Sequence, residues 1–198
     1  MKATPTLDDL AHALAAGETT SRALVEGCLA RIDDRDGGGA RVFLRVDREA
    51  ALRAADAMDG LRQAGTAPSR FTGIPVSIKD LFDIAGQVTR AGSRALEDAT
   101  PAAQDAPAVA RLRSAGFIVI GRTNMTEFAF SGVGLNPHYG TPPSAWDRAT
   151  GRIPGGSSSG AAVSVSDGMA HVALGHLCVP KIRFCNIGGE GRRELGVT

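Results

Sequence analysis

The sequence predicts an α/β fold in which helices alternate with short buried strands. Three observations lead to this prediction. Segments with helical periodicity alternate with short apolar runs, a pattern typical of α/β proteins. The 198 residues are enough for one domain with a sizeable core, and 43% of them are hydrophobic. The 25 glycines favour many turns between short elements, and neither an internal repeat nor a clear domain boundary interrupts the pattern.

The first half of the chain is predicted to be mostly helical. Thr6 can cap a first helix that has Asp9 at the capping-box position and that ends at Gly17. The further elements expected here are a helix opened by Thr20 or Ser21 that runs to about Ile32, a loop over residues 33–39, an alternating strand over 42–46, an alanine-rich helix over 48–61 and a loop over 63–69.

Two apolar runs in the second half predict buried strands. Ile74–Ile78 and Phe117–Ile120 are both bounded by residues that break secondary structure, and we expect them to lie in one sheet. The remaining elements expected are a helix over residues 106–114, a short helix over 125–130, irregular chain over 131–156, and a helix over 161–174 that breaks at Gly168 and passes into a strand at 172–174.

The composition excludes several classes of protein. The net charge is +1 and the basic residues are scattered without interleaved aromatic residues, so we expect no nucleic-acid partner. No apolar run approaches the roughly 20 residues of a membrane span, and the N-terminus lacks the apolar core of a signal peptide. Cys28, Cys178 and Cys185 are an odd, widely spaced set that predicts neither a disulfide framework nor a metal-binding pair. We therefore expect a reduced, cytoplasmic protein that uses no metal, cofactor or membrane.

The stretch I-P-G-G-S-S-S-G-A-A, residues 153–162, is the first candidate for a functional site. It could be a flexible linker, but it leads directly into a helix, whose free N–H groups favour anions. A Walker-type phosphate loop is disfavoured because Gly160 is followed by Ala161 instead of lysine. A nucleophile elbow, G-x-S-x-G over 156–160, would need an acid and then a histidine downstream, and Asp167 lies too close in the chain to be convincing.

Lysine is the other residue type that could activate a serine here. Lys79 ends the apolar run over residues 74–78, where its amine can lie in a poorly solvated position. Loss of solvation favours the neutral form of an amine, which can accept a proton from a serine. The alternative is a lysine that lies in water at the end of a strand, and the residues alone leave both interpretations open.

Four ordered motifs resemble those of the amidase signature family. G-I-P-V-S-I-K-D-L-F-D (73–83) is similar to the family's lysine motif, and V-I-G-R-T-N-M-T-E-F-A-F (119–130) to the motif that follows it. N-P-H-Y-G-T-P (136–142) and P-G-G-S-S-S-G-A-A-V (154–163) complete the order, so the resemblance covers roughly residues 5–175. Simple amidases and the A subunits of glutamine-dependent amidotransferases share these motifs. The resemblance implies a layered α/β/α fold around a mixed sheet.

The resemblance also implies a chemistry. Members of the family hydrolyse carboxamides to acids and ammonia with a Ser-Ser-Lys triad and no cofactor. Lys79 matches the family's lysine, and Ser157 matches the bridging serine, which follows a cis peptide and relays a proton toward the lysine. By the same resemblance, Gly155, Gly156 and Ser158 would bind a small-molecule amide substrate. The chain could also form a homodimer.

The sequence departs from the family pattern near its end. After A-L-G the family has T-D-T-G-G-S-I-R, with the serine as nucleophile, whereas this chain has H-L-C-V-P-K-I-R. Lys181 therefore stands at the nucleophile position, and Val179 and Pro180 replace the glycine pair that would supply oxyanion donors. Because proline has no N–H, one donor is absent. His176 and Cys178 could serve as a substitute pair, but nothing else in the sequence positions them.

These features divide the chain into two parts. Residues 1–175 resemble the N-terminal part of an amidase-signature domain, and residues 176–198 form a divergent tail. We expect a protein that resembles a carboxamide-hydrolysing amidase but is inactive, because Lys181 replaces the nucleophile. The alternatives are a non-catalytic fragment or pseudoenzyme, and a part similar to the A subunit of a glutamine-dependent amidotransferase.

Overall fold

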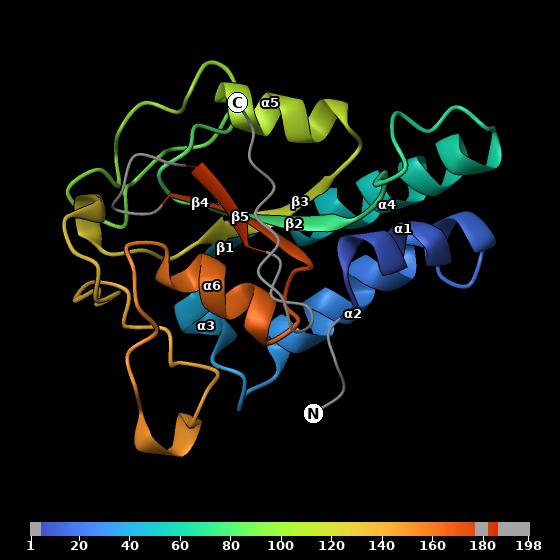
Figure 1. The fold of residues 1–198 in the computed structure, drawn as a ribbon. Coiled ribbons are helices and arrows are strands. Elements are labelled where there is room, and N and C mark those ends of the chain that lie inside the picture. The colour runs from blue at the N-terminus through green and yellow to red at the C-terminus, as the bar shows by residue number, and fades with distance from the viewer. Residues whose placement is uncertain (1–4, 177–181, 186–198) are drawn as a thin grey trace.

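The structure, a computed structural model, describes residues 5–176 and the backbone of residues 182–185 (Figure 1). The elements in chain order are α1 (Leu7–Ala16), α2 (Ser21–Asp33), α3 (Gly39–Val42), β1 (Phe43–Val46), α4 (Arg48–Gln63), β2 (Pro75–Lys79), α5 (Pro107–Ser114), β3 (Ile118–Thr123), the 3₁₀ turns η1 (Glu127–Ala129) and η2 (Arg148–Thr150), α6 (Ser159–Ser166), β4 (Val172–His176) and β5 (Ile182–Cys185).

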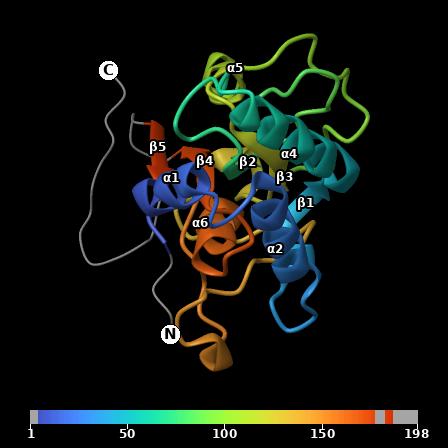
Figure 2. The same ribbon diagram turned by 90° about the vertical axis from the view of Figure 1, so that its right-hand side faces the viewer.

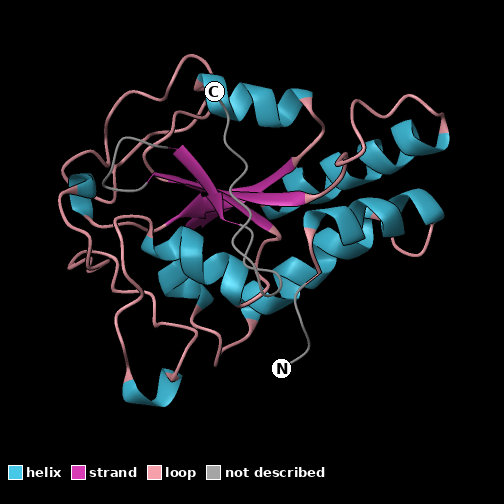
Figure 3. Ribbon diagram, in the orientation of Figure 1, coloured by secondary structure: helices cyan, strands magenta, loops and turns pink. Residues whose placement is uncertain are grey.

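The described strands form one mixed sheet in the order β1-β3-β2-β4-β5, which Figure 2 shows across its width. β2 is parallel to both β3 and β4, while the outer strands β1 and β5 are antiparallel to their neighbours. Helix α5 lies on one side of the sheet, and α2, α3 and α6 lie on the other (Figure 3). This arrangement confirms the predicted layered α/β fold with a mixed sheet. It also confirms that the two apolar runs lie in one sheet, because they form the neighbouring strands β2 and β3.

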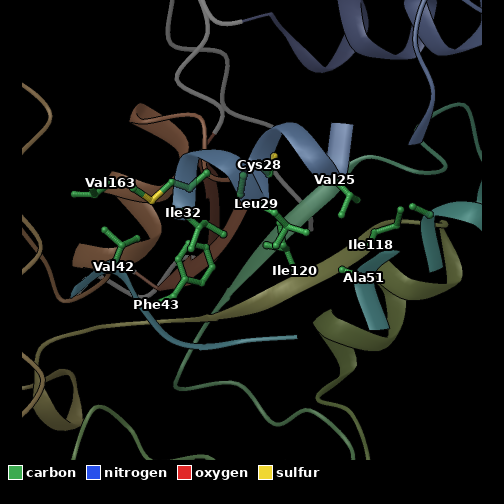
Figure 4. Packing of buried hydrophobic residues seen from close by; sticks show 13 residues of the cluster. Val25, Cys28, Leu29, Ile32, Val42, Phe43, Ala51, Ile118, Ile120 and Val163 are labelled. Carbon is green, nitrogen blue, oxygen red and sulfur yellow. The ribbon is translucent and has the colours of Figure 1, made fainter. Parts of the chain in front are cut away.

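Of the three apolar clusters among the described residues, the two larger ones join most of the elements. The larger one joins α2, α3, α4 and α6 to β1 and β3, and Figure 4 shows Ile118 and Ile120 of β3 packed beneath the side chains of α2. The second cluster lies between β2, β4, α1 and α5, where Val76 and Ile78 are fully buried. Successive side chains of a strand point to opposite faces, so Ser77 points toward α6 and shares a 2.9 Å hydrogen bond with Ser164. Lys79, two residues further on, lies on this same face.

The predicted start of α1 is confirmed in detail. Thr6 Oγ1 accepts a hydrogen bond from the backbone N–H of Asp9 at 3.1 Å, and Asp9 Oδ2 accepts one from the N–H of Thr6 at 2.8 Å. This reciprocal capping box satisfies two backbone donors that the helix itself leaves without partners. Gly17 ends the helix with φ of +71°, a conformation that glycine adopts without steric cost.

Three expected boundaries were wrong. Residues 39–42 form the short helix α3, where the sequence suggested the end of a loop and the start of a strand. β3 continues to Thr123 instead of ending at residue 120, because β1 pairs with residues 121–123. The short helix expected over 125–130 is only the 3₁₀ turn η1, in which Phe128 has a positive φ of 50°.

Both expectations for residues 161–174 are confirmed: the helix breaks near Gly168, and the chain then passes into a strand. α6 ends at Ser166, and Gly168 then takes a φ of +69°, which ends the helical conformation. The chain returns as β4, which begins at Val172 as expected and runs to His176. β4 therefore crosses the predicted boundary at residue 175. No helix among the described residues has the length and apolar character that crossing a membrane requires.

Candidate active site

Lys79 and Ser157 meet at the carboxyl end of β2. The Nζ atom of Lys79 lies 2.7 Å from Oγ of Ser157, and both residues are fully buried. Lys79 is the last residue of β2, while Ser157 lies in the loop that enters α6. The end of a parallel strand and the start of the helix packed on it come together at the same edge of the sheet, which brings together two residues that are 78 positions apart.

The loop that carries Ser157 is fixed by backbone hydrogen bonds. The Gly156–Ser157 peptide is cis, as the resemblance implied. The carbonyl of Ser157 accepts a hydrogen bond from the N–H of Thr126 at 3.0 Å, and the N–H of Gly156 donates to the carbonyl of Gly132 at 2.8 Å. A Cβ atom on Gly156 would lie 2.7 Å from the backbone nitrogen of Gly134, so only glycine allows the two loops to approach this closely.

The backbone carbonyl of His176 is a further part of the site. It accepts hydrogen bonds from Lys79 Nζ at 3.1 Å and from Ser158 Oγ at 2.6 Å. The hydroxyl of Ser158 in turn accepts from the N–H of His176 at 3.0 Å, so this serine joins the start of α6 to the end of β4. Sequence reasoning considered only the side chain of His176. A backbone carbonyl carries no residue-type signal, and the sequence offered no means of finding this contact.

A cleft opens beside the Ser157 loop. Its volume is about 300 Å³, and it is lined by Gly132, Pro154, Gly155, Gly156, Ser158, Ala161, Ala162, Ala173, Gly175 and His176. All three residues that were expected to bind substrate therefore line this cleft. Its walls are mostly small or apolar, and a ligand there would approach the backbone closely. A second cleft, of about 280 Å³, lies at the other end of α6 around Arg148 and Asp167, away from Lys79.

The nucleophile-elbow interpretation gains no support from the geometry. Asp167, the acid that it would use, accepts a hydrogen bond from Arg148 Nη2 at 2.5 Å. The elbow would also need a downstream histidine, and burial lowers the pKa of one such residue, His171, which lies directly before β4. Among the described residues, no three His, Cys, Asp or Glu side chains are close enough together to hold a metal ion. Residues 178–181, which include Lys181, lie outside the described part of the chain.

Sequence reasoning missed a buried ion pair beside Lys79. Asp80 Oδ1 accepts a hydrogen bond from Arg122 Nε at 2.6 Å, and the two side chains are 1% and 2% exposed. The sequence does contain a signal for buried charges here. Asp80 directly follows an apolar strand and Arg122 lies within one, and a lone charge in such a place would be costly. The sequence could not show that the two charges are partners.

Comparisons with known proteins identify relatives of this chain. The amidase family model matches residues 23–176. The A subunit of the glutamyl-tRNA(Gln) amidotransferase of Chromohalobacter salexigens is 40% identical over 188 residues, which cover 93% of this chain and 38% of that protein. The 2-amino-5-chloromuconic acid deaminase of Comamonas testosteroni is 41% identical over 163 residues, 80% of this chain and 34% of the relative.

Solved structures show the same fold. The peptide amidase from Stenotrophomonas maltophilia superposes with a TM-score of 0.76 at 35% identity, covering 85% of this chain and 35% of its own. A chain from a vestigial protein complex related to the origins of an s-triazine catabolic enzyme gives 0.80 at 36% identity, with 86% and 37% covered. This chain thus spans less than two fifths of the length of each of these relatives. The matched family model, the relatives and the shared fold place the chain in the amidase signature family.

Proposed function

We propose that Lys79 and Ser157 form the proton-relay part of an amide-hydrolysing centre. The observation that carries this proposal is the 2.7 Å contact between Lys79 Nζ and Ser157 Oγ, made by two fully buried residues next to the Gly155–Gly156 cleft. A buried amine beside a hydroxyl is the arrangement that general-base activation of a serine requires. The family membership supports the same assignment.

In this relay the neutral amine of Lys79 accepts the hydroxyl proton of Ser157, while Ser157 takes a proton from a nucleophilic hydroxyl. That hydroxyl attacks the amide carbonyl, and its proton returns through Ser157 to the nitrogen, which leaves as ammonia as the C–N bond breaks. Water then hydrolyses the ester formed on the hydroxyl, which releases the acid and restores the hydroxyl. The carbonyl of His176 contributes by accepting a hydrogen bond from Lys79 Nζ, which fixes the direction of the amine. Ser158 keeps this carbonyl in place from the start of α6.

We further propose that this chain as written does not turn over amides. Lys181 stands where the family has its nucleophilic serine. An amine at that position would form a stable amide with an acyl group instead of a labile ester. Pro180 lacks the N–H that an oxyanion hole needs, and loss of one such donor alone typically lowers turnover by roughly 10²–10³.

A second candidate is a role similar to that of an amidotransferase A subunit. It is favoured by the 40% identity to the Chromohalobacter salexigens protein over 93% of the chain. In this case glutamine would be the amide substrate. Release of ammonia from glutamine but not from acetamide or benzamide would separate this candidate from a simple amidase.

The test measures ammonia release from acetamide, benzamide and glutamine. We expect wild type to give no more ammonia than Lys79→Ala. Clear turnover that disappears in both Lys79→Ala and Ser157→Ala would overturn the proposal of inactivity.

A second measurement addresses the relay itself. The triple variant Val179→Gly, Pro180→Gly and Lys181→Ser restores the family pattern at three positions. We expect a small serine-directed sulfonyl fluoride to modify the serine introduced at position 181, as located by peptide mass spectrometry. Addition of Lys79→Ala should suppress this modification. The relay proposal fails if the introduced serine does not react, or if it reacts equally well without Lys79.

A further inference from the structure

The buried pair Asp80–Arg122 lies directly after the lysine of the site. Asp80 uses both carboxylate oxygens: Oδ1 accepts from Arg122 Nε at 2.6 Å, and Oδ2 accepts from the N–H of Gly92 at 3.0 Å. Its backbone is fixed as well, because the N–H of Asp80 donates to Thr123 at 3.1 Å and its carbonyl accepts from Ala91 at 2.9 Å. Four hydrogen bonds therefore hold the residue that follows Lys79.

Arg122 ties this end of β2 to the next strand and to the loop beyond it. It lies on β3, and its Nη2 atom donates to the carbonyl of Phe82 at 2.9 Å and to Oγ1 of Thr89 at 3.2 Å. Removing two charges from water is costly, and a buried ion pair is often no more stabilising than apolar residues of similar size. Arg122 Nη1 is buried without a hydrogen-bond partner, while the other polar atoms of the two side chains are bonded to Gly92, Phe82, Thr89 and each other. The pair is therefore better explained by the geometry that it imposes than by its stability.

The same network reaches the backbone of Ser157. The carbonyl of Gly92 accepts a hydrogen bond from Asn136 Nδ2 at 2.8 Å, and that amide group also donates to the carbonyl of Met125 at 2.8 Å. The next residue, Thr126, donates its N–H to the carbonyl of Ser157. Gly92 has a φ of +67°, and a Cβ there would lie 2.9 Å from the Met125 carbonyl oxygen, so the two loops are closely packed.

We propose that Asp80, paired with Arg122, is a positioning residue for the Lys79–Ser157 relay. This inference rests on the proposed function for the importance of that contact, although the contact itself can be measured without turnover. Lys79 reaches Ser157 through a flexible side chain, and the place of its Nζ depends on the backbone at the end of β2. Asp80 fixes that backbone and, through Gly92 and Asn136, also fixes the loop that holds Ser157. The positions of both Lys79 and Ser157 therefore depend on the carboxylate of Asp80.

The test reads the contact through the lysine signals. The chain contains only three lysines, Lys2, Lys79 and Lys181, so protein labelled with carbon-13 lysine gives three sets of Cε signals. Lys2→Arg and Lys181→Arg variants assign them. In the wild-type background, Ser157→Ala should shift the Lys79 Cε signal, because it removes the neighbouring hydroxyl. In the Asp80→Asn background, the same substitution should shift this signal by roughly half as much or less, because the contact is already loosened.

Controls separate positioning from a general loss of stability. Asp167→Asn removes the acid of another Arg–Asp pair, at the far end of α6, and should leave the response of Lys79 to Ser157→Ala unchanged. Arg122→Lys keeps the buried positive charge but loses the geometry of the guanidinium, so it carries the test if Asp80→Asn does not fold, as judged by circular dichroism. The fourth lysine signal that it adds is identified as the one absent from the wild-type spectrum. The positioning role would be overturned if, in a folded Asp80→Asn or Arg122→Lys protein, Ser157→Ala shifted the Lys79 Cε signal as much as it does in wild type. It would leave the relay proposal standing, since that is tested by labelling at position 181.

Discussion

Gly160, the second residue of α6, is expected to be among the least replaceable positions of the fold. A Cβ added there would lie 2.5 Å from the carbonyl oxygen of Val42 and 2.7 and 2.8 Å from the backbone nitrogen and oxygen of Asn124. These are backbone atoms at the ends of α3 and β3, and no side-chain rotation can move them away. The N–H of Gly160 also donates to the carbonyl of Asn124 at 2.9 Å, so the glycine joins α6 to β3.

The cost of Gly160→Ala follows from these distances. Carbon–oxygen contacts ordinarily begin at about 3.3 Å, so α6 would have to retreat by roughly 0.5–0.8 Å. Overpacking of this kind costs about 1–3 kcal/mol, and a weakened hydrogen bond to Asn124 adds about 1 kcal/mol. We expect the free energy of unfolding to fall by about 2–4 kcal/mol, which lowers Tm by roughly 5–15 °C for a chain of this size. Ser157 lies three residues earlier, so the retreat would also lengthen its contact with Lys79.

Urea and thermal unfolding followed by circular dichroism measure this effect. Gly27→Ala is the matched control, because Gly27 lies on the exposed side of α2 with nothing within 4 Å of its added Cβ. There alanine should stabilise the protein by up to about 1 kcal/mol through its higher helix propensity. A Gly160→Ala variant as stable as wild type, measured beside a Gly27→Ala variant that behaves as expected, would refute this account of how α6 is packed.

Three further predictions follow from local contacts. Hydrogen bonds from Thr6 hold the pKa of Asp9 below its usual value of 3.8, so its carboxylate stabilises the fold above that pH and loses this effect as the pH falls through the lower folded pKa. Asp9→Asn should therefore lower Tm at neutral pH, and its Tm should converge with that of wild type in strong acid; an equal deficit at both pH values would contradict this. Ser77→Ala breaks the buried hydrogen bond to Ser164, and a double-mutant cycle of the two positions in urea should give a coupling of about 0.5–1.5 kcal/mol, whereas strict additivity would show that the bond contributes nothing. Burial raises the pKa of the Cys28 thiol to about 12, so iodoacetamide at pH 8 should leave the Cys28 peptide unmodified in the native protein and alkylate it in urea.

Local patterns in the sequence determined most of the secondary structure. The capping box at Thr6, the glycine that ends α1 and the apolar run of β2 each depend on residues within a few positions of one another, so they can be read without knowing the fold. The motifs also predict Lys79 and Ser157 as a pair. The error at the end of β3 arose because pairing with β1, which is far away in the sequence, extends the strand over residues 121–123. The local pattern did not reveal the short helix α3, which directly precedes β1.

Only the tertiary structure decided how the site is built. Lys79 and Ser157 are 78 positions apart, and their contact exists because a parallel strand ends where the helix packed on it begins. The carbonyl of His176 takes part through backbone geometry that is the same for every residue type. Asp80 and Arg122 were visible as charges within or beside apolar runs, but their pairing depends on the register between β2 and β3. Side-chain periodicity records which face of an element is buried, whereas partners across the sheet are set by strand order and register, which short-range sequence patterns do not encode.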